Sequence, residues 1–244
     1  MSLLGQTLII TGASKGIGKA LALELARNGA NLVLNARNEE ALNAVGDESC
    51  GFGVQVRTVS GDAALDRTAQ FMVKAAKVIG NFAGFIHNAG VLHPGPKLWE
   101  LSEAQFDEVF AANVKAGFLL AKYAFPNLRR SGAGIAVFVG SGAANRPRAG
   151  WGAYGAAKAA EHYLAFNLAL EAPEIVTFVY SPGTVDTEMQ RQGREAQGEI
   201  AEMFQGFKAE GRLIRPEETA AALVRILEGE SSRFHGKIAT YKDV

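Results

Sequence analysis

The sequence predicts one α/β domain, in which a doubly wound parallel sheet of about seven strands carries helices on both faces. Short runs rich in β-branched and aromatic residues alternate with longer runs whose apolar residues have helical spacing. Such alternation is typical of βαβ crossovers, which bring parallel strands into one sheet. The 244 residues suffice for one well-buried core, and no stretch has the composition of a linker. We therefore expect a single domain over residues 1–244.

Each predicted element follows from its local pattern. The expected strands are Thr7–Thr11, Asn31–Ala36, Val54–Val59, Phe82–His87, Ile135–Gly140, Ile175–Tyr180 and Lys237–Tyr241. The expected helices are Ile17–Asn28, Glu39–Glu48, Ala63–Ile79, Glu103–Leu128, Gly152–Glu171 and Glu217–Glu228. The stretch Pro182–Arg215 interrupts the alternation with five glycines among charged and apolar residues. We expect residues 182–215 to form a mobile substrate lid within the domain.

Composition narrows the classes of partner. The chain has 25 acidic and 25 basic side chains, so no charge excess favours nucleic acid or an anionic membrane surface. Cys50 is the only cysteine, which excludes an internal disulfide, and we expect it to be half-buried. The histidines lack metal-ligand spacing, so no metal site is expected. The N-terminus lacks the basic region of a secretory signal, and we expect a soluble cytoplasmic protein with a small-molecule partner.

Ser141, Tyr154 and Lys158 offer a hydrogen-bond donor for a carbonyl oxygen, an acid, and a cation that tunes the acid. Tyr154 and Lys158 are four positions apart, so both side chains rise from one face of the predicted helix. A free phenol titrates near ~10, and a nearby ammonium stabilises the phenolate. Ser141 follows a buried strand at a Gly-Ser-Gly turn, at the carboxyl edge of the sheet. Each residue alone could be structural, but their joint spacing favours catalysis.

A glycine loop between the first strand and the first helix predicts a dinucleotide site. Its glycines, Gly12, Gly16 and Gly18, let the backbone approach a pyrophosphate that the helix N-terminus binds. The spacing Gly-x-x-x-Gly-x-Gly departs from the Gly-x-Gly-x-x-Gly fingerprint, so a plain strand-to-helix turn is the alternative. The cofactor contacts expected from this loop are Gly12, Ser14, Lys15, Gly16, Ile17 and Gly18.

The end of the second strand indicates the cofactor type. An acid there would hold the ribose 2′-hydroxyl of NAD, whereas an arginine accommodates a 2′-phosphate. The segment Asn35-Ala36-Arg37 has no acid, and Lys15 could add a second cation to Arg37. Either cation alone could be a solvated surface group. Their coincidence with the missing acid favours NADP(H) over NAD(H).

Further cofactor contacts are expected where the third and fourth strands end. Asp62 could accept a hydrogen bond from an adenine amino group, and Asn88 could brace neighbouring strands. Ala89 and Gly90 follow Asn88, and Gly90 would allow a ribose to lie close. Helix capping by Asp62 and simple loop chemistry at the others are the alternatives.

These motifs occur in the order found in short-chain dehydrogenases/reductases, and the sequence resembles that family over nearly its full length. The resemblance rests on the glycine loop, Asp62, Asn88-Ala89-Gly90, Asn113, Ser141, Tyr154, Lys158 and Pro182-Gly183. It implies a Rossmann-type domain with a nicotinamide cofactor and a catalytic tetrad of Asn113, Ser141, Tyr154 and Lys158. It also implies that Tyr154 and Lys158 contact the cofactor, and that Asn113 holds a water linking Lys158 to solvent. Homodimers or homotetramers are expected by the same analogy.

Within the family, residues 168–190 are similar to the sepiapterin reductase branch and to bacterial benzil reductases. This similarity makes Pro182, Gly183, Val185, Thr187 and Met189 cofactor contacts, with Gly183 and Met189 also near the substrate. Trp151 is a further candidate for the substrate pocket. The carboxylate that anchors the pterin in sepiapterin reductases aligns with Ala239, and Asp243 is nearby but out of register.

The expected activity is the reduction of a ketone, such as an aromatic diketone or a pterin side-chain carbonyl, by NADPH with Tyr154 as the acid. A 3-ketoacyl thioester reductase and an alcohol dehydrogenase of the same family are alternatives. A protein that senses NADPH without turnover is a hypothesis from another class. The presence of all four tetrad residue types argues against the sensor.

Overall fold

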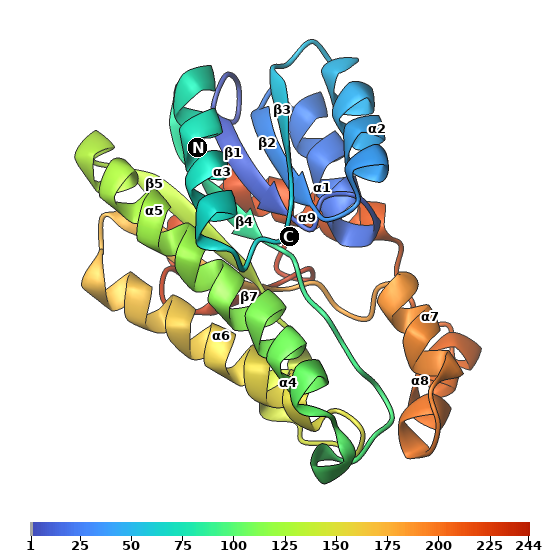
Figure 1. The fold of residues 1–244 in the computed structure, drawn as a ribbon. Coiled ribbons are helices and arrows are strands. Elements are labelled where there is room, and N and C mark those ends of the chain that lie inside the picture. Colours follow the sequence, from blue (N-terminus) through green and yellow to red (C-terminus); the bar gives the residue numbers. More distant parts are fainter. Residues whose placement is uncertain (1) are drawn as a thin grey trace.

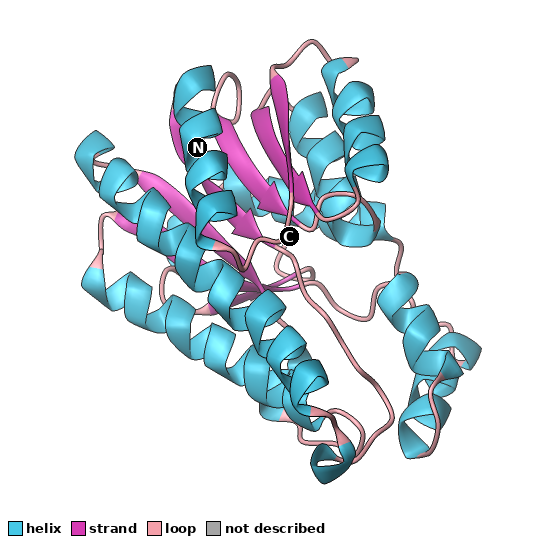
Figure 2. Cartoon of the chain, in the orientation of Figure 1, coloured by secondary structure: helices cyan, strands magenta, loops and turns pink. Residues whose placement is uncertain are grey.

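A computed structural model describes residues 2–244 and follows the predicted alternation of strands and helices (Figures 1 and 2). The strands are β1 (Thr7–Thr11), β2 (Asn31–Ala36), β3 (Val56–Ser60), β4 (Phe82–His87), β5 (Gly134–Val139), β6 (Ile175–Ser181) and β7 (Ile238–Thr240). The α-helices are α1 (Gly16–Arg27), α2 (Glu39–Cys50), α3 (Asp66–Ile79), α4 (Glu103–Phe110), α5 (Ala116–Ser131), α6 (Gly152–Glu171), α7 (Glu188–Glu195), α8 (Glu199–Ala209) and α9 (Pro216–Glu228). A π-helical turn (Ala111–Lys115) joins α4 to α5, and 3-10 turns cover Leu98–Glu100, Gly142–Asn145 and Ser231–Phe234.

The strands form one seven-stranded sheet in the order β3-β2-β1-β4-β5-β6-β7, and every neighbouring pair is parallel. This arrangement confirms the predicted Rossmann-type fold class. The chain reverses its direction of winding between β1 and β4. A crevice therefore opens at the carboxyl ends of these strands, where sheets of this kind bind ligands.

Helices cover the sheet on both faces. Helices α1, α2 and α9 lie on one face, and α3, α5 and α6 lie on the other (Figure 1). Each face has its own cluster of buried apolar side chains, so the central strands are apolar on both sides, as parallel strands require. Within residues 2–244, none of the helices has the length and apolar character that a membrane crossing needs.

Two predicted helices differ from those in the structure. Helix α3 begins at Asp66 rather than Ala63, because the Asp62 carboxylate accepts a hydrogen bond from the Ala64 N–H at 2.8 Å and closes a turn first. The continuous helix predicted over residues 103–128 contains the π-turn around Asn113. The prediction that Cys50 is half-buried was also wrong, since this residue is exposed at the end of α2.

Residues 182–215 contain α7 and α8, and we call them the α7–α8 segment. The two helices pack against each other and stand beside the sheet (Figure 1). Gly193 permits this packing, because a Cβ at that position would lie 2.5 Å from the Phe204 ring. Ile200 and Phe204 join a third apolar cluster, which also contains Tyr154 of α6. The segment is therefore anchored beside the predicted catalytic tyrosine, and its role as a mobile lid stays a prediction.

Candidate active site and cofactor cleft

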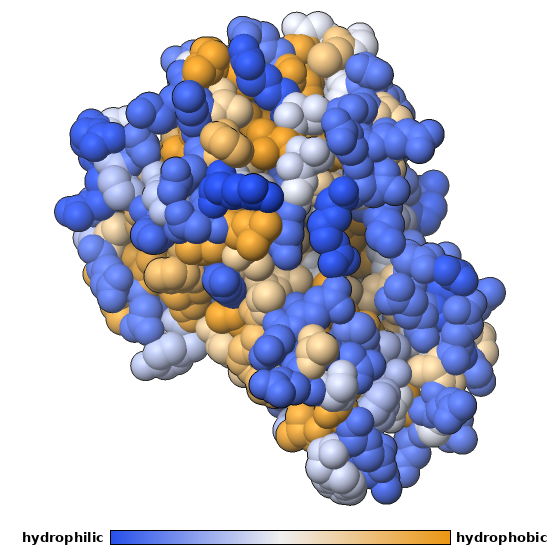
Figure 3. Space-filling model, viewed as in Figure 1, coloured by the Kyte–Doolittle hydropathy of each residue, from blue (hydrophilic) through white to orange (hydrophobic). Residues whose placement is uncertain are grey.

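A cavity of about 680 Å³ lies at the carboxyl ends of the strands, between the sheet and the α7–α8 segment. The surface is hollowed between these two parts, and hydrophilic residues predominate over the segment (Figure 3). The predicted residues that line this cavity are Gly12, Ser14, Lys15, Gly16, Ile17, Arg37, Asp62, Asn88, Ala89, Gly90, Ser141, Trp151, Tyr154, Lys158, Pro182, Gly183, Val185, Thr187 and Met189. Gly18 and Asn113 lie behind its wall rather than on it.

Gly12 and Gly18 of the glycine loop are packed so tightly that a Cβ at either position would collide with backbone atoms. Gly12 and Gly16 have positive φ angles of 65° and 54°. A Cβ at Gly18 would lie 2.1 Å from the Gly12 carbonyl oxygen, and one at Gly12 would lie 2.9 Å from the Cα of Ala89. Gly12 and Gly16 therefore present only backbone atoms to the cavity, and a ligand can lie close to them.

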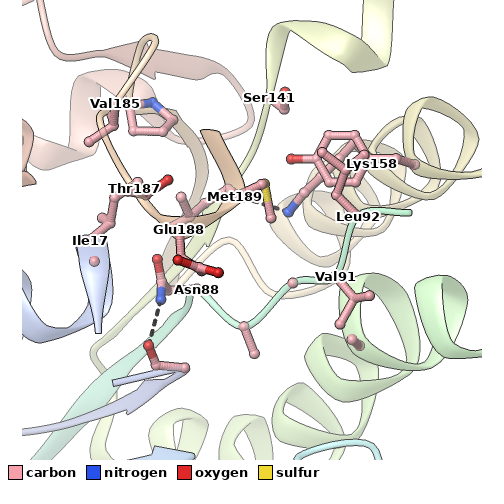
Figure 4. A pocket seen from close by; sticks show the side chains of 18 of the residues that line it. Ile17, Asn88, Val91, Leu92, Ser141, Lys158, Val185, Thr187, Glu188 and Met189 are labelled. Atoms are coloured by element: carbon pink, nitrogen blue, oxygen red, sulfur yellow. Dashed lines mark hydrogen bonds between the residues drawn. The ribbon is translucent and has the colours of Figure 1, made fainter. Parts of the chain in front are cut away.

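The loop after β4 is tied to the glycine loop through β1. The Asn88 side-chain amide donates to the carbonyls of Thr11 and Gly12, both at 3.1 Å. The Thr11 hydroxyl accepts hydrogen bonds from the backbone N–H groups of Asn88 and Ala89 at 3.0 and 3.1 Å. Asn88 thus braces two strand ends, as predicted, and Figure 4 shows its side chain beside Ile17 at this end of the cavity.

Arg37 lies at the far end of the cavity, where it pairs with an acid that the sequence reasoning did not consider. Its guanidinium is 2.9 Å from Glu108 of α4, and His93 Nε2 is 2.9 Å from the other oxygen of that carboxylate. Hydrogen bonds from Arg37 and then His93 hold the pKa of Glu108 below its usual range. Exposed pairs of this kind contribute only about 0–1 kcal/mol, so a phosphate could displace Glu108 from Arg37.

The cleft fits a dinucleotide on geometric grounds. Helix α1 begins at Gly16 with no side-chain cap and no acid in its first turn, so its N-terminal N–H groups and dipole are available to an anion. The Asn35 side chain donates to the carbonyls of Val59 and Gly61, which joins β2 to β3 beneath the predicted adenine contact Asp62. Residues 12–18 would hold the pyrophosphate, and the loops after β2 and β3 would hold the adenosine half.

Ser141, Tyr154 and Lys158 meet at the other end of the cavity. In Figure 4 the side chains of Ser141, Met189 and Lys158 extend into one space. Ser141 caps a 3-10 turn, and its hydroxyl accepts from the Ala143 N–H at 3.2 Å. The Lys158 Nζ lies 5.9 Å from the centre of the Tyr154 ring, close enough for its charge to act on the phenol. The predicted trio therefore forms one constellation.

Asn113 lies at the centre of the π-turn and explains why the helix is irregular there. Its amide donates to the carbonyls of Val109 at 2.8 Å and Val91 at 2.9 Å, so a side chain takes the place of a helical backbone donor. Its Oδ1 is buried without a hydrogen-bond partner, and a Cβ at Gly90 would lie 2.7 Å from it. This orphaned acceptor faces the loop beside Lys158.

A group of buried titratable residues behind Lys158 escaped the sequence reasoning. The Lys158 ammonium donates to the Val139 carbonyl at 2.9 Å and to Glu161 at 2.8 Å. Glu161 and His87 are fully buried, and His162 accepts from the Ser141 N–H at 3.4 Å. The available signal was the placement of Glu161 and His162 three and four residues after Lys158, on the helix face that must be buried.

Burial sets the protonation of this group. It raises the pKa of Glu161 to about 7, against the attraction of Lys158. Burial and the Lys158 charge lower the pKa of His87 to about 3 and that of His162 to about 4, so both imidazoles are neutral near pH 7. Burial also opposes the charge of Lys158, but attraction to Glu161 and Tyr154 outweighs it and keeps the Lys158 pKa above its ordinary value.

Aromatic side chains and arginines surround the end of the cavity where Tyr154 lies. Trp151 packs edge-on against Tyr154 and Phe204, with ring centres 6.2 and 5.7 Å apart. Met189 and Phe207 line the same region. Arg146, Arg148 and Arg212 also line the cavity, and within residues 2–244 neither Arg146 nor Arg148 has an ion-pair partner.

The C-terminal end does not reach the cavity. Ala239 is buried in β7, and the Asp243 carboxylate accepts from the Thr240 N–H and hydroxyl at 2.6 and 2.9 Å. Neither residue lines the cavity. Among the residues that the structure describes, no group of three or more His, Cys, Asp or Glu side chains could hold a metal ion.

Comparison with known proteins agrees with this geometry. Residues 6–198 match the family model described as short chain dehydrogenase. An uncharacterized oxidoreductase of Saccharomyces cerevisiae is 30% identical, over 98% of this chain and 97% of its own length. The (S)-benzoin-forming benzil reductase of the same yeast is 29% identical, over 98% of this chain and 97% of that protein. A short chain dehydrogenase from Burkholderia cenocepacia, solved in complex with NADP, superposes with a TM-score of 0.86 at 27% identity, covering 98% of this chain and 97% of that one.

Proposed function

This chain belongs to the short chain dehydrogenase family, and on that basis we propose that it is an NADP(H)-dependent oxidoreductase that reduces a ketone to an alcohol. One observation carries the proposal: Ser141, Tyr154 and Lys158 converge on the same cavity as the glycine loop. An acid, a hydroxyl that can donate to a substrate carbonyl, and a cation thus lie in the same cavity as the proposed dinucleotide site. The expected homo-oligomer and the cytoplasmic location stay predictions.

The geometry supports a separate role for each residue of the tetrad. The bound nicotinamide supplies the hydride for the carbonyl carbon. Ser141 donates a hydrogen bond to the carbonyl oxygen, and Tyr154 transfers its phenolic proton to that oxygen. The Lys158 ammonium stabilises the phenolate that remains. We assign Asn113 the role of holding a water near Lys158, because its buried Oδ1 has no partner in the described residues.

NADP(H) is the cofactor that the adenosine end favours. Arg37 and Lys15 both line the cavity, and β2 ends without an acid that could hold a ribose 2′-hydroxyl. The partner that Arg37 now has, Glu108, is a solvent-exposed carboxylate. We propose that the 2′-phosphate takes the place of Glu108 on Arg37, with Lys15 as a second cation.

The substrate end favours an aromatic ketone that carries an acidic group. Trp151, Phe204 and Phe207 supply apolar walls, while the unpaired Arg146 and Arg148 supply cations. Because the 2′-phosphate belongs at the Arg37 end, these arginines are free to attract an anion on the substrate. The similarity to benzil reductase supports an aromatic substrate. A pterin is less favoured, since neither Ala239 nor Asp243 offers a carboxylate to the cavity.

The test follows NADPH oxidation by the purified protein with benzil, phenylglyoxylate, a pterin ketone and a 3-ketoacyl thioester. We expect turnover of the aromatic ketones, and a fall of about 10³-fold in kcat for Tyr154→Phe with NADPH affinity unchanged. Tyr163→Phe, a change to an exposed tyrosine on the same helix, is the matched control. Tight NADPH binding with no carbonyl turned over would instead support the non-catalytic sensor, and preference for the thioester would support the acyl reductase.

A further inference from the structure

Glu161 is an acid in an unusual place for a residue without an assigned role. It lies on α6, one helical turn after Lys158, and its side chain is fully buried. One carboxylate oxygen accepts a hydrogen bond from the Lys158 ammonium at 2.8 Å. The other oxygen has no hydrogen-bond partner in the described part of the chain. Burying an ionised carboxylate costs free energy of folding, so the contact between Glu161 and Lys158 points to a role beyond stability.

Two hydrogen bonds fix the position of the Lys158 ammonium group. An ammonium has three N–H donors, and Lys158 uses one on Glu161 and one on the Val139 carbonyl of β5. Both acceptors hold the head group against the sheet. The third donor is left for the cavity, which Lys158 lines together with Tyr154. Glu161 therefore helps to aim the cation toward the reacting groups.

No other charge balances Glu161. His87 of β4 faces its free oxygen, with Nε2 3.6 Å away. The Thr11 hydroxyl accepts two backbone N–H groups and lies 3.0 Å from His87 Nδ1, so it donates there and leaves the ring proton on Nε2. The imidazole is thus neutral. His162, on the same helix, is neutral as well, and Lys158 is the one cation in contact with Glu161 among the described residues.

We propose that Glu161 is a positioning residue whose carboxylate holds Lys158 and sets how strongly the Lys158 charge acts on the Tyr154 phenol. When Glu161 is ionised, its negative charge offsets the ammonium, and the phenol keeps its proton more firmly. When Glu161 is protonated, no negative charge opposes the attraction of the Lys158 ammonium for the phenolate. Because burial raises the pKa of Glu161 to about 7, the protein passes between these two settings near neutral pH.

Glu161→Gln tests the proposal, because it keeps the shape and a hydrogen-bond acceptor for Lys158 but removes the charge. The rate readout rests on the proposed function and uses the pH profile of kcat/KM for ketone reduction. Without the opposing charge, the phenol should lose its proton at lower pH. We therefore expect the alkaline fall of the profile to move down by about one pH unit. Glu171→Gln, at an exposed position on the same helix, should leave the profile unchanged.

A second measurement needs no turnover and so separates this inference from the proposed function. In infrared spectra of the cofactor-free protein, the band of a protonated carboxyl group should disappear with a midpoint near pH 7 and should be missing in Glu161→Gln. An unchanged pH profile in a folded Glu161→Gln protein would overturn the proposal and leave Glu161 a structural role. Absence of that band at every pH above 5 would overturn it too, even if the variant failed to fold.

Discussion

The two ends of the cavity are built differently. At the proposed phosphate end, the glycine loop and the loop after β4 present backbone atoms to the cavity. Hydrogen bonds of 3.0 and 3.1 Å between Asn88 and Thr11 join the two loops. The substrate end is formed by side chains such as Trp151 and Phe204, partly on the α7–α8 segment. Where backbone atoms form the site, few substitutions leave its shape unchanged. Where side chains form it, each residue can be substituted separately. We therefore expect substitutions to be tolerated better among the side chains near Trp151 and Phe204 than in the glycine loop.

The largest effect is expected from breaking the backbone cradle. Gly18→Ala would put a Cβ 2.1 Å from the Gly12 carbonyl oxygen, so the loop must shift. We expect NADPH affinity to fall at least about 100-fold, or roughly 3 kcal/mol, as measured by fluorescence titration. Gly206→Ala on α8 is the matched control, because its nearest neighbour would be 3.8 Å away. Wild-type affinity in a folded Gly18→Ala protein would show that the loop is not the cradle.

A smaller effect is expected at the adenosine end, where side chains rather than backbone select the cofactor. Arg37→Asp should lower the preference for NADPH over NADH by about 10- to 100-fold, measured as the ratio of kcat/KM values. Glu108→Gln should raise the same ratio a few-fold, because it removes the carboxylate that competes for Arg37. Arg27→Gln serves as a surface control on α1. If the ratio is indifferent to Arg37→Asp, the phosphate assignment is wrong.

The smallest effect is expected from single side chains at the substrate rim. Phenylglyoxylate and its methyl ester differ in charge but share the aromatic ketone. Arg148→Gln should lower kcat/KM for the acid by about 3- to 10-fold and leave the ester unchanged, since only the acid loses an ionic partner. High salt should reduce the advantage of the acid in the wild-type enzyme. Equal losses for acid and ester would indicate that Arg148 shapes the pocket instead.

The sequence predicted the parts of the molecule that depend on local pattern. The sheet, the glycine loop and the Tyr154–Lys158 spacing each follow from periodicity or from fixed separations along the chain. Asn113 could be named, but not its π-turn, because that turn depends on a hydrogen bond to Val91 in a different loop. The glycines of residues 182–215 suggested a mobile lid but not its two helices, which pack against each other with the Phe204 ring close to Gly193.

Contacts between distant segments were not predicted either, because they depend on the tertiary fold and not on local sequence pattern. Arg37 and Glu108 are far apart in the sequence, and only the folded cavity brings them within 2.9 Å. Glu161 is near Lys158 in sequence and on a helix face expected to be buried, but its hydrogen bond to Lys158 and its position beside His87 of β4 appear only in the folded protein. The chemistry of the site was therefore predictable in kind, while the charges that tune it required the structure.

One parallel bridge, between Val185 and Ile214, closes the base of the α7–α8 segment. The Ile214 N–H donates to the Thr184 carbonyl at 3.0 Å, and the Asp186 N–H donates to the Ile214 carbonyl at 2.9 Å. Val185 and Ile214, at the two ends of the segment, thus lie one strand spacing apart, about 4.8 Å. The bridge joins the base of the segment in addition to the packing of Ile200 and Phe204 beside Tyr154. Residues 186–213 carry the predicted cofactor contacts Thr187 and Met189 together with Phe204 of the apolar wall, so exchanging this segment would alter the cofactor contacts and the apolar wall together.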